Sequence, residues 1–323
     1  MIRWGVAGPG GIAERFATAM SMVEGGAIVS VASRSLERAD AFADRFGVAT
    51  RYVDYDALAD DADVDIVYVA TPHAFHERDT LRFLEAGKHV LCEKPLALNA
   101  AQGSRMVAFA RERGLFLMEA MWTRFLPAYR TLVALVADGR IGEPRVVEAD
   151  FGFRMPVLAE HRLFAPGLGG GALLDLGIYP VQLCSLLLGE PDQVVAAGAI
   201  GTTGVDEQVA GVLRHPNGAL GVVKAAIRTN LTCTARISGT DGAVELPAFM
   251  HCPQHLEIVT PSGRERIDGS FEGDGLRFQI DEIHQCLAEG RLESAVMPLD
   301  ESLQIARTLD AMRAQVGVVY PGE

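Results

Sequence analysis

The sequence predicts an α/β protein of two domains: an N-terminal doubly wound parallel sheet, and a C-terminal α+β domain with a largely antiparallel open sheet. Its 323 residues exceed the usual size of a single hydrophobic core. Up to about residue 122, short apolar runs alternate with helical patterns, as in parallel strands joined by helices. From about Glu143, strand patterns separated by turn residues replace that alternation. We therefore expect domains at residues 1–122 and 123–299.

Composition narrows the class of partner. A net charge of −13 provides no basic surface for nucleic acid and argues against an anionic membrane. The five cysteines include no Cys-x-x-Cys pair, and no apolar stretch approaches the ~20 residues that span a bilayer. The chain enters a strand pattern directly after Met1, without a signal-peptide pattern. We expect a cytoplasmic protein that binds a small molecule.

The first strand is predicted at Trp4-Gly5-Val6-Ala7, and a glycine-rich turn and a helix follow it. Gly8-Pro9-Gly10-Gly11-Ile12-Ala13 has the G-x-G-x-x-A spacing of the Rossmann dinucleotide-binding turn. Glycines permit a tight turn and close approach of a pyrophosphate to the helix N-terminus, where free N–H groups favour anions. The alternative is a glycine turn with a structural role alone. We expect the cofactor to contact Gly8, Gly10, Gly11, Ile12 and Ala13.

The position that reads the cofactor ribose follows the second strand, Ile28-Val29-Ser30-Val31-Ala32. It holds Ser33 and Arg34, with Arg38 one helical turn later. An acidic residue here would repel a 2′-phosphate, whereas a hydroxyl followed by arginine attracts one. The sequence therefore favours NADP over NAD, unless these arginines only solvate a loop and a helix start.

Two further strands are predicted at Ile66 to Ala70 and His89 to Cys92. Ligands of doubly wound sheets bind at the carboxyl ends of the strands. We expect cofactor contacts there from Thr71, Pro72, His76, Glu93 and Lys94. His73 and His76 lie three apart, but without a third convergent ligand we expect them at a loop and a helix start and expect no metal site. The helix after Pro95 should begin at Asn99, with Gln102 completing a capping box.

Lys94 is the strongest candidate for chemistry. Lysine occurs only at Lys88, Lys94 and Lys224, and every other fixed cation is arginine. An ammonium group can be tuned as an acid or a base, whereas a guanidinium cannot lose its proton near neutral pH. Pro95 favours extended backbone at Lys94, which would hold it at a strand end. The alternative is a surface lysine lying over apolar neighbours.

The second domain is predicted to contain strands at Arg145 to Phe153, Gln193 to Ile200, Gln208 to Arg214, Ala219 to Ile227 and Cys233 to Ser238. Pro216-Asn217-Gly218 and Thr240-Asp241-Gly242 supply hairpin turns. Between the first strands lies Gly169 to Pro180, which leads into an apolar helix. In a helix, Asp175 and Tyr179 would share one face. Pro180 predicts a kink there or a helix that starts near Tyr179. The alternatives are an N-cap at Asp175 and a buried aromatic at Tyr179.

These motifs together resemble the glucose-fructose oxidoreductase, inositol dehydrogenase and MocA family over most of the chain. The marks are Gly8 to Ala13, Ala70 to His76, Gly87 to Pro95 and Gly169 to Tyr179. Tyr179 stands where many members carry histidine, and with Met118 to Phe125 it resembles the branch of dimeric trans-dihydrodiol dehydrogenases and NADP-dependent D-xylose 1-dehydrogenases. The resemblance implies that Lys94 and Tyr179 are catalytic, that Asp175 assists, and that the helix at 300–316 returns to the nucleotide-binding domain.

The expected reaction is oxidation of a hydroxyl, which requires a proton acceptor while hydride leaves carbon. Tyr179 could accept the proton if the Lys94 ammonium lowers its pKa from about 10. Asp175 would orient substrate hydroxyls, and Trp122, Arg124 and Phe153 would line the substrate, although Trp122 and Arg124 could equally pack at the domain interface. With few candidate cations, we expect an unphosphorylated aldose oxidised at C1, with a trans-diol as the competing substrate.

Two further expectations concern assembly and class. Runs such as Leu220-Gly221-Val222-Val223 are apolar on successive residues, so both faces of the second sheet need cover, and a second subunit could cover one in a homodimer. The alternative to an enzyme is a non-catalytic NADP-binding redox sensor with the same pocket. Lys94, Asp175 and Tyr179 favour the enzyme, because a sensor does not need them.

Overall fold

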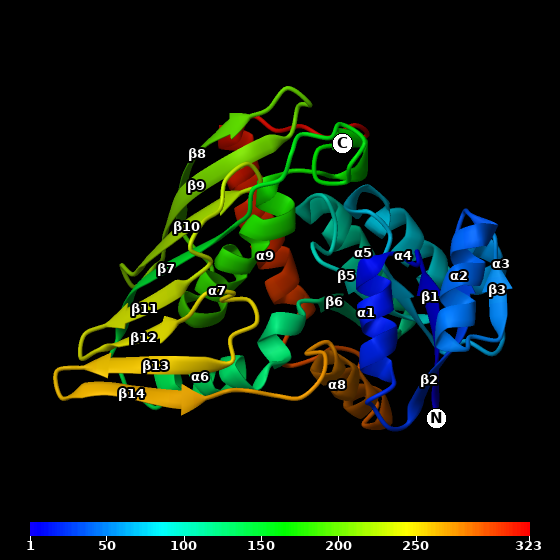
Figure 1. The fold of residues 1–323 in the computed structure, drawn as a ribbon, viewed down its shortest axis with the longest axis horizontal. Helices are drawn as coiled ribbons and strands as arrows, with labels where there is room; N and C mark the ends of the chain where they lie inside the picture. Colours follow the sequence, from blue (N-terminus) through cyan, green and yellow to red (C-terminus); the bar gives the residue numbers. More distant parts are fainter. The chain divides into compact units, whose positions relative to one another are not determined.

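The computed structural model describes all 323 residues, which form two compact units (Figure 1). Unit 1 comprises Met1–Phe125 and Glu272–Ser302, and unit 2 comprises Leu126–Phe271 and Leu303–Glu323. The first boundary lies close to the expected one. The segment Glu272–Ser302, expected in the second domain, belongs instead to unit 1.

Unit 1 contains a six-stranded, fully parallel sheet in the order β3-β2-β1-β4-β5-β6. The strands are β1 (Ile2–Ala7), β2 (Gly26–Ala32), β3 (Thr50–Tyr52), β4 (Ile66–Val69), β5 (His89–Glu93) and β6 (Leu117–Ala120). β1, β4, β5 and β6 are almost entirely buried, as strands covered on both faces must be. The strand order reverses between β1 and β4, which is the switch point at which such sheets bind ligands.

The helices of unit 1 are α1 (Gly11–Met20), α2 (Leu36–Phe46), α3 (Tyr55–Ala59), α4 (His76–Glu85), α5 (Ala100–Arg113) and α8 (Arg277–Ala288). The helix after Pro95 begins where the sequence predicts. Asn99 caps α5 by accepting the N–H of Gln102 at 2.9 Å, while Gln102 Oε1 accepts the N–H of Leu98 at 3.1 Å, which confirms the capping box. α8 packs on α1, and His284 accepts the indole N–H of the fully buried Trp4 at 3.1 Å.

Unit 2 contains an eight-stranded sheet in the order β14-β13-β12-β11-β7-β10-β9-β8. The strands are β7 (Pro144–Gly152), β8 (Gln193–Ile200), β9 (Asp206–Arg214), β10 (Leu220–Ala226), β11 (Ala235–Gly239), β12 (Ala243–Leu246), β13 (His255–Thr260) and β14 (Gly263–Asp268). All neighbouring pairs are antiparallel except β7 and β10. The five strands expected from the sequence are confirmed within about two residues at each end.

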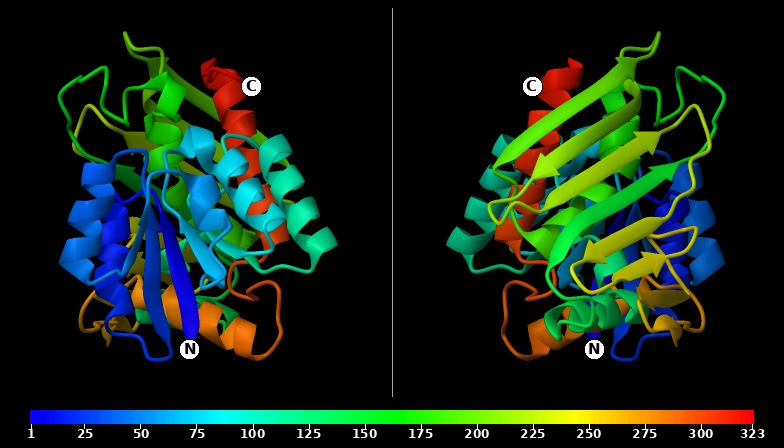
Figure 2. Two further views of the ribbon diagram at one scale, coloured as in Figure 1. Left: turned by 90° about the vertical axis from the view of Figure 1, so that its right-hand side faces the viewer. Right: turned by 90° about the vertical axis from the view of Figure 1, so that its left-hand side faces the viewer.

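Helices cover one face of this sheet. α6 (Pro127–Ala137) contacts β13, α7 (Ile178–Leu188) contacts β7 and β10, and α9 (Leu299–Val316) lies against β8 through Gln315, which bonds the backbone of Val194 and Ala196 at 2.9 Å each. α9, which was expected to return to the nucleotide-binding domain, is divided between the units: Leu299–Ser302 belong to unit 1 and the rest of the helix to unit 2. The right-hand view of Figure 2 shows the strands with no helix in front of their other face.

One apolar helical segment, contrary to expectation, is long enough to span a bilayer. Pro166–Leu188 is long and apolar enough to cross a membrane by length and composition, with a mean hydropathy of 1.6. However, 83% of its most apolar window is buried within the protein, as in a core helix of a folded domain. Its hydrophobicity is therefore accounted for by the packing of η3 (Pro166–Leu168), the π-helical turn η4 (Leu173–Gly177) and α7.

Candidate active site

The glycine turn after β1 fits a dinucleotide. Gly8 has φ +87°, and a Cβ there would lie 3.0 Å from the carbonyl oxygen of Ala70, so only glycine suits the position. A Cβ on Gly10 or Gly11 would meet no atom within 4 Å, which leaves open space beside the N-terminus of α1. Ala13 is fully buried. The turn thus combines exposed N–H groups, a helix dipole and room for a pyrophosphate.

Ser33 and Arg34 follow β2 directly, and Arg38 lies in the first turn of α2. The buried Ser33 hydroxyl accepts the N–H of Ser35 at 3.2 Å. Both arginines are exposed, and neither forms an ion pair, in a chain whose arginines are mostly paired with carboxylates. The Arg34 guanidinium lies over the ring of Phe75 at 5.5 Å. Two cations without carboxylate partners therefore stand at the ribose end of the turn.

His76 is a correction to the expected cofactor contacts. It is fully buried, with Nε2 at 2.8 Å from the carbonyl oxygen of Thr71 and Nδ1 at 2.7 Å from that of Pro95. Because both ring nitrogens serve backbone groups, His76 braces the loops after β4 and β5 and has none left for a ligand. Thr71 remains available: its buried Oγ1 has no hydrogen-bond partner within the protein.

The loop after β5 places Lys94 at the carboxyl end of the sheet, as expected. The Lys94–Pro95 peptide bond is cis. Glu93 accepts a hydrogen bond from the hydroxyl of the buried Tyr68 and, through Oε2, the N–H of Lys94 at 3.2 Å. Leu96 donates its N–H to Glu119 Oε1 at 2.9 Å. Buried carboxylates on β5 and β6 thus hold the backbone on both sides of the Lys94–Pro95 bond.

The other two lysines have evident structural partners. Lys88 donates to the carbonyl oxygens of Asp61 and Val64 at 2.6 and 2.8 Å. Lys224 pairs with Asp150 at 3.2 Å. Lys88 and Lys224 therefore have structural roles. Lys94 differs from them in its position at the carboxyl end of the parallel sheet.

Glu119, at the end of β6, is a candidate that the sequence analysis missed. Burial raises the pKa of this carboxyl to about 7, and the nearby Glu93 raises it further, against the lowering effects of Ser302, the Leu96 N–H and Arg124. Glu119 Oε2 has no hydrogen-bond partner. The motif Met118-Glu119-Ala120 carried no pattern that marked its carboxyl as buried.

Trp122 and Arg124 lie in η2 (Trp122–Phe125), and the structure gives both of them partners within unit 1. The Arg124 side chain is fully buried, pairs with Glu301 at 2.7 Å and lies 3.4 Å from the carbonyl oxygen of Val296. Arg124, expected to contact the substrate, thus has a structural ion pair in unit 1. The guanidinium of Arg15, which also pairs with Asp274, lies over the ring of Trp122 at 5.2 Å. One face of the indole is thus already covered.

Unit 2 carries Asp175 within the π-helical turn η4 and Tyr179 in the first turn of α7. This arrangement explains how Pro180 fits: the wider turn breaks the α-helical pattern just before the proline. Asp175 is not an N-cap. Its buried carboxylate forms a two-point ion pair with Arg162, at 2.8 and 3.2 Å.

Tyr179 belongs to an aromatic cluster that includes a residue the sequence did not reveal. Its ring lies 5.4 Å from those of both Phe151 and His251, which themselves stack at 4.4 Å. Phe153 continues the cluster, 6.5 Å from Phe151, and is 36% exposed. His251 follows β12 in an irregular segment, where no spacing links it to Tyr179. The cluster provides an aromatic wall of mutually tilted rings, in which only Phe151 and His251 stack, with a hydroxyl and an imidazole on it.

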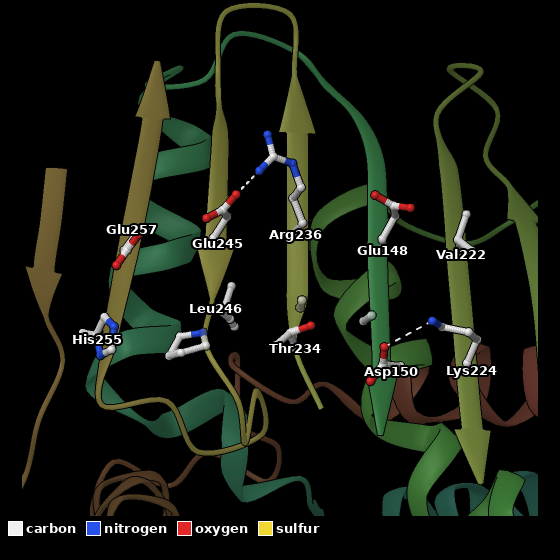
Figure 3. Close-up of a pocket in the computed structure, with 13 residues that line it drawn as sticks. Glu148, Asp150, Val222, Lys224, Thr234, Arg236, Glu245, Leu246, His255 and Glu257 are labelled. Atoms are coloured by element: carbon white, nitrogen blue, oxygen red, sulfur yellow. Dashed lines mark hydrogen bonds and ion pairs between the residues drawn. The ribbon is translucent and has the colours of Figure 1, made fainter. Parts of the chain in front are cut away.

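A pocket of about 580 Å³ lies elsewhere, on the helix-free face of the unit 2 sheet (Figure 3). Charged side chains dominate its lining, and two ion pairs cross it, Arg236 with Glu245 and Lys224 with Asp150. Tyr179 is on α7, which covers the opposite face. This pocket is therefore separate from the residues proposed for chemistry.

Comparison with known proteins establishes the class and then the family. Residues 2–121 match the oxidoreductase family with an NAD-binding Rossmann fold, and residues 129–245 match the GFO/IDH/MocA C-terminal domain. The fold and the glycine turn define an NAD(P)-dependent dehydrogenase. The chain belongs to the GFO/IDH/MocA oxidoreductase family.

Similar proteins span the whole chain. Trans-1,2-dihydrobenzene-1,2-diol dehydrogenase of Mus musculus is 39% identical, covering 99% of this chain and 98% of its own, and that of Danio rerio is 37% identical with the same coverage. A 3-ketoreductase from Actinomadura kijaniata, solved with NADP and TDP-benzene, is 30% identical with a TM-score of 0.89 and 98% coverage of both chains. An aldose-aldose oxidoreductase from Caulobacter crescentus, solved with glycerol, is 26% identical with a TM-score of 0.89, covering 98% and 97%.

The raised pKa of Glu119 predicts a pH-dependent stability difference. Unfolding returns the pKa of this carboxyl from about 7 to its ordinary value of 4.5, so ionisation destabilises the folded state increasingly as pH rises between these values. Glu119→Gln removes that penalty. Relative to the original protein, the variant should gain about 2 kcal/mol in free energy of unfolding between pH 5 and pH 8. Urea unfolding at both pH values measures this, with the exposed Glu112→Gln as control. A pH-independent difference would refute the assignment.

Proposed function

We propose that the protein oxidises a secondary hydroxyl of a cyclic trans-diol, or the C1 hydroxyl of an unphosphorylated aldose, with NADP as acceptor. The observation that carries this proposal is the aromatic cluster around Tyr179, with Phe151 and His251 at 5.4 Å and the Asp175–Arg162 pair one helical turn earlier in the chain. Such a wall suits a neutral ring with hydroxyl groups. The full-length relatives that act on a trans-dihydrodiol support the diol.

The chain's own residues would divide the work as follows. When bound, the nicotinamide supplies the hydride acceptor. The glycine turn and the N-terminus of α1 would hold the pyrophosphate, and Thr71 and Glu93 would contact the cofactor at the sheet end. We propose that Tyr179 accepts the hydroxyl proton and that the Lys94 ammonium favours the tyrosinate. Asp175, oriented by Arg162, would bind a neighbouring substrate hydroxyl.

The proposed substrate class is tested with a panel. We expect NADPH formation with a cyclic trans-diol, D-xylose or D-glucose, and little with their phosphates, because no cation cluster for a phosphate stands beside Tyr179. Absorbance at the NADPH band measures the rates. A strong preference for a phosphosugar or an acidic substrate would overturn the proposal. Tight NADP binding with no turnover on any alcohol would favour a redox sensor.

Cofactor preference is proposed to depend on Ser33, Arg34 and Arg38. Ser33→Asp can keep the hydrogen bond to the Ser35 N–H but adds a charge that repels a 2′-phosphate. The ratio of kcat/KM for NADP over NAD should fall roughly tenfold or more, equivalent to about 1.4 kcal/mol. Ser33→Ala, which adds no charge, is the control. Equal use of both cofactors by the original protein would contradict the proposal.

The acid–base roles predict large losses of turnover. Lys94→Ala and Tyr179→Phe should each lower kcat roughly a hundredfold while leaving NADP affinity nearly unchanged. Phenylalanine keeps the ring contacts with Phe151 and His251, so that variant removes the hydroxyl alone. Lys94→Arg keeps the charge and shows whether a labile proton is needed. If both residues serve one step, the double variant should lose little more than either single one.

A homodimer through the helix-free sheet face is also proposed. One row across this face pairs Val195 with Val212 and Val212 with Val222, and these strands expose Val195 to 55% and Val212 to 42%. The row then continues as charged residues from Glu148 to Arg236 and Glu245. An antiparallel sheet in water normally presents polar residues on its open face, so the apolar half needs a partner. A twofold axis would bury it against itself.

Sedimentation tests the dimer. The original protein should sediment as a dimer at micromolar concentration, and Val212→Asp should convert it to a monomer by burying an unpaired charge. Val133→Asp, at a 39% exposed valine on α6, should leave the dimer intact. A monomeric original protein would refute the interface.

A further inference from the structure

The start of the segment that carries Asp175 is held by two residues distant in sequence. Leu173 donates its N–H to Asp206 Oδ2 at 2.6 Å, and Asp206 is the first residue of β9. Tyr320, three residues before Glu323, donates its hydroxyl to the carbonyl oxygen of Gly170 at 2.6 Å. Two long-range hydrogen bonds thus fix Gly170, three residues before η4, and Leu173, the first residue of η4.

Gly171 shows how closely these groups approach the segment. It has φ +122°, and a Cβ there would lie 2.2 Å from Asp206 Oδ1 and 3.3 Å from the Tyr320 hydroxyl oxygen. No other residue could occupy the position without moving Asp206. The backbone at Gly171 is therefore pressed against both anchoring side chains.

Tyr320 is itself held in place by the last turn of the chain. The Arg313 guanidinium lies over its ring at 5.1 Å and pairs with Glu323 and Asp310. Glu323 also accepts the N–H of Tyr320 at 3.0 Å. The C-terminal residues therefore form a folded clasp.

A buried aspartate at position 206 lowers the stability of the fold relative to an apolar residue. It is 1% exposed, and its Oδ1 has no hydrogen-bond partner. Burial raises the pKa of this carboxyl to about 7, although the N–H groups of Leu173 and Ala172 and the charge of Arg313 lower it. A buried, half-bonded carboxylate destabilises a fold relative to an apolar residue of the same size. An apolar residue, however, could not accept the Leu173 N–H and so could not fix the backbone there.

The anchored segment runs directly into the proposed chemistry. The π-helical turn η4 holds Asp175, and α7 begins at Ile178 with Tyr179 as its second residue. π-helical turns are rare and often lie at functional sites, and the direction of this one depends on the groups that hold its N-terminal end as well as on its packing against β7, β9 and β10. We propose that Asp206 and Tyr320 are positioning residues that fix the N-terminal end of this turn and thereby orient Asp175 and Tyr179 for the reaction. This inference rests on the proposed role of Tyr179.

Asp206→Asn and Tyr320→Phe test the inference on the full-length enzyme. Each should lower kcat about five- to twentyfold, because small misplacements of reacting groups cost rate steeply. KM for NADP should stay unchanged, since the nucleotide-binding residues lie in unit 1. Asp192→Asn, at a surface carboxylate of unit 2 paired with Arg214, is the matched control and should retain full turnover. A rise in KM for NADP with unchanged kcat would overturn the inference.

Two more readouts separate positioning from a merely structural role. Asp206 is the buried acid that titrates near pH 7 in unit 2, facing Arg313 and the Tyr320 hydroxyl with Glu323 behind them. Asp206→Asn should therefore remove an inflection near pH 7 from the kcat profile, and an unchanged profile would count against the inference. Both substitutions are repeated in the Tyr179→Phe background, where their effect should largely vanish.

The outcomes are distinguishable. If Tyr179→Phe alone retains normal turnover, the proposed function fails and the inference falls with it. If Tyr179→Phe is impaired but Asp206→Asn lowers kcat equally in both backgrounds, the proposed function stands and the positioning role is refuted. Should Asp206→Asn fail to fold, Tyr320→Phe, which removes one hydroxyl only, decides alone.

Discussion

Parallel hydrogen bonding of β1 to both β2 and β4 is the constraint on which the nucleotide-binding unit depends. It aligns the carboxyl ends of neighbouring strands at one edge, so loops from residue 8, residue 33, residue 71 and residue 93 meet there although they are distant in sequence. His76 then ties two of these loops together through their carbonyl oxygens. The glycine turn and the Lys94 loop are therefore positioned by one sheet rather than by separate local features.

Short sequence patterns predicted the turns, helix caps and most strands that depend on neighbouring residues. The glycine turn, the capping box at Asn99, four strands of the first sheet and five of the second follow from periodicity and turn chemistry, and the structure has them. β3, β6, β12, β13 and β14 were not predicted: the first three span only three or four residues, and β14 is mostly charged. The sequence also could not show which residues the candidate side chains contact. Nothing local shows that Arg124 meets Glu301, or that His251 lies beside Tyr179.

Two buried carboxylates, Glu119 and Asp206, accept backbone N–H groups beside the segments proposed for chemistry. In unit 1, Glu119 accepts the N–H of Leu96, two residues after Lys94. In unit 2, Asp206 accepts the N–H of Leu173, two residues before Asp175. In both cases burial raises the pKa to about 7 and one oxygen has no partner. Such groups cost stability but fix backbone direction, which an apolar core residue cannot do.

The π-helical turn before α7 connects these observations to reactivity. An α-helix running through Pro180 would lose the hydrogen bond that the proline nitrogen cannot donate. The π-helical turn over Leu173–Gly177 leaves Pro180 in the first turn of α7, where a helix needs no N–H donor, and it places Asp175 against Arg162 and Tyr179 against Phe151 and His251. The turn therefore sets the directions of two side chains at once. Its N-terminal end is bonded to groups from β9 and from the C-terminal clasp, so these distant parts of the chain help to set both directions.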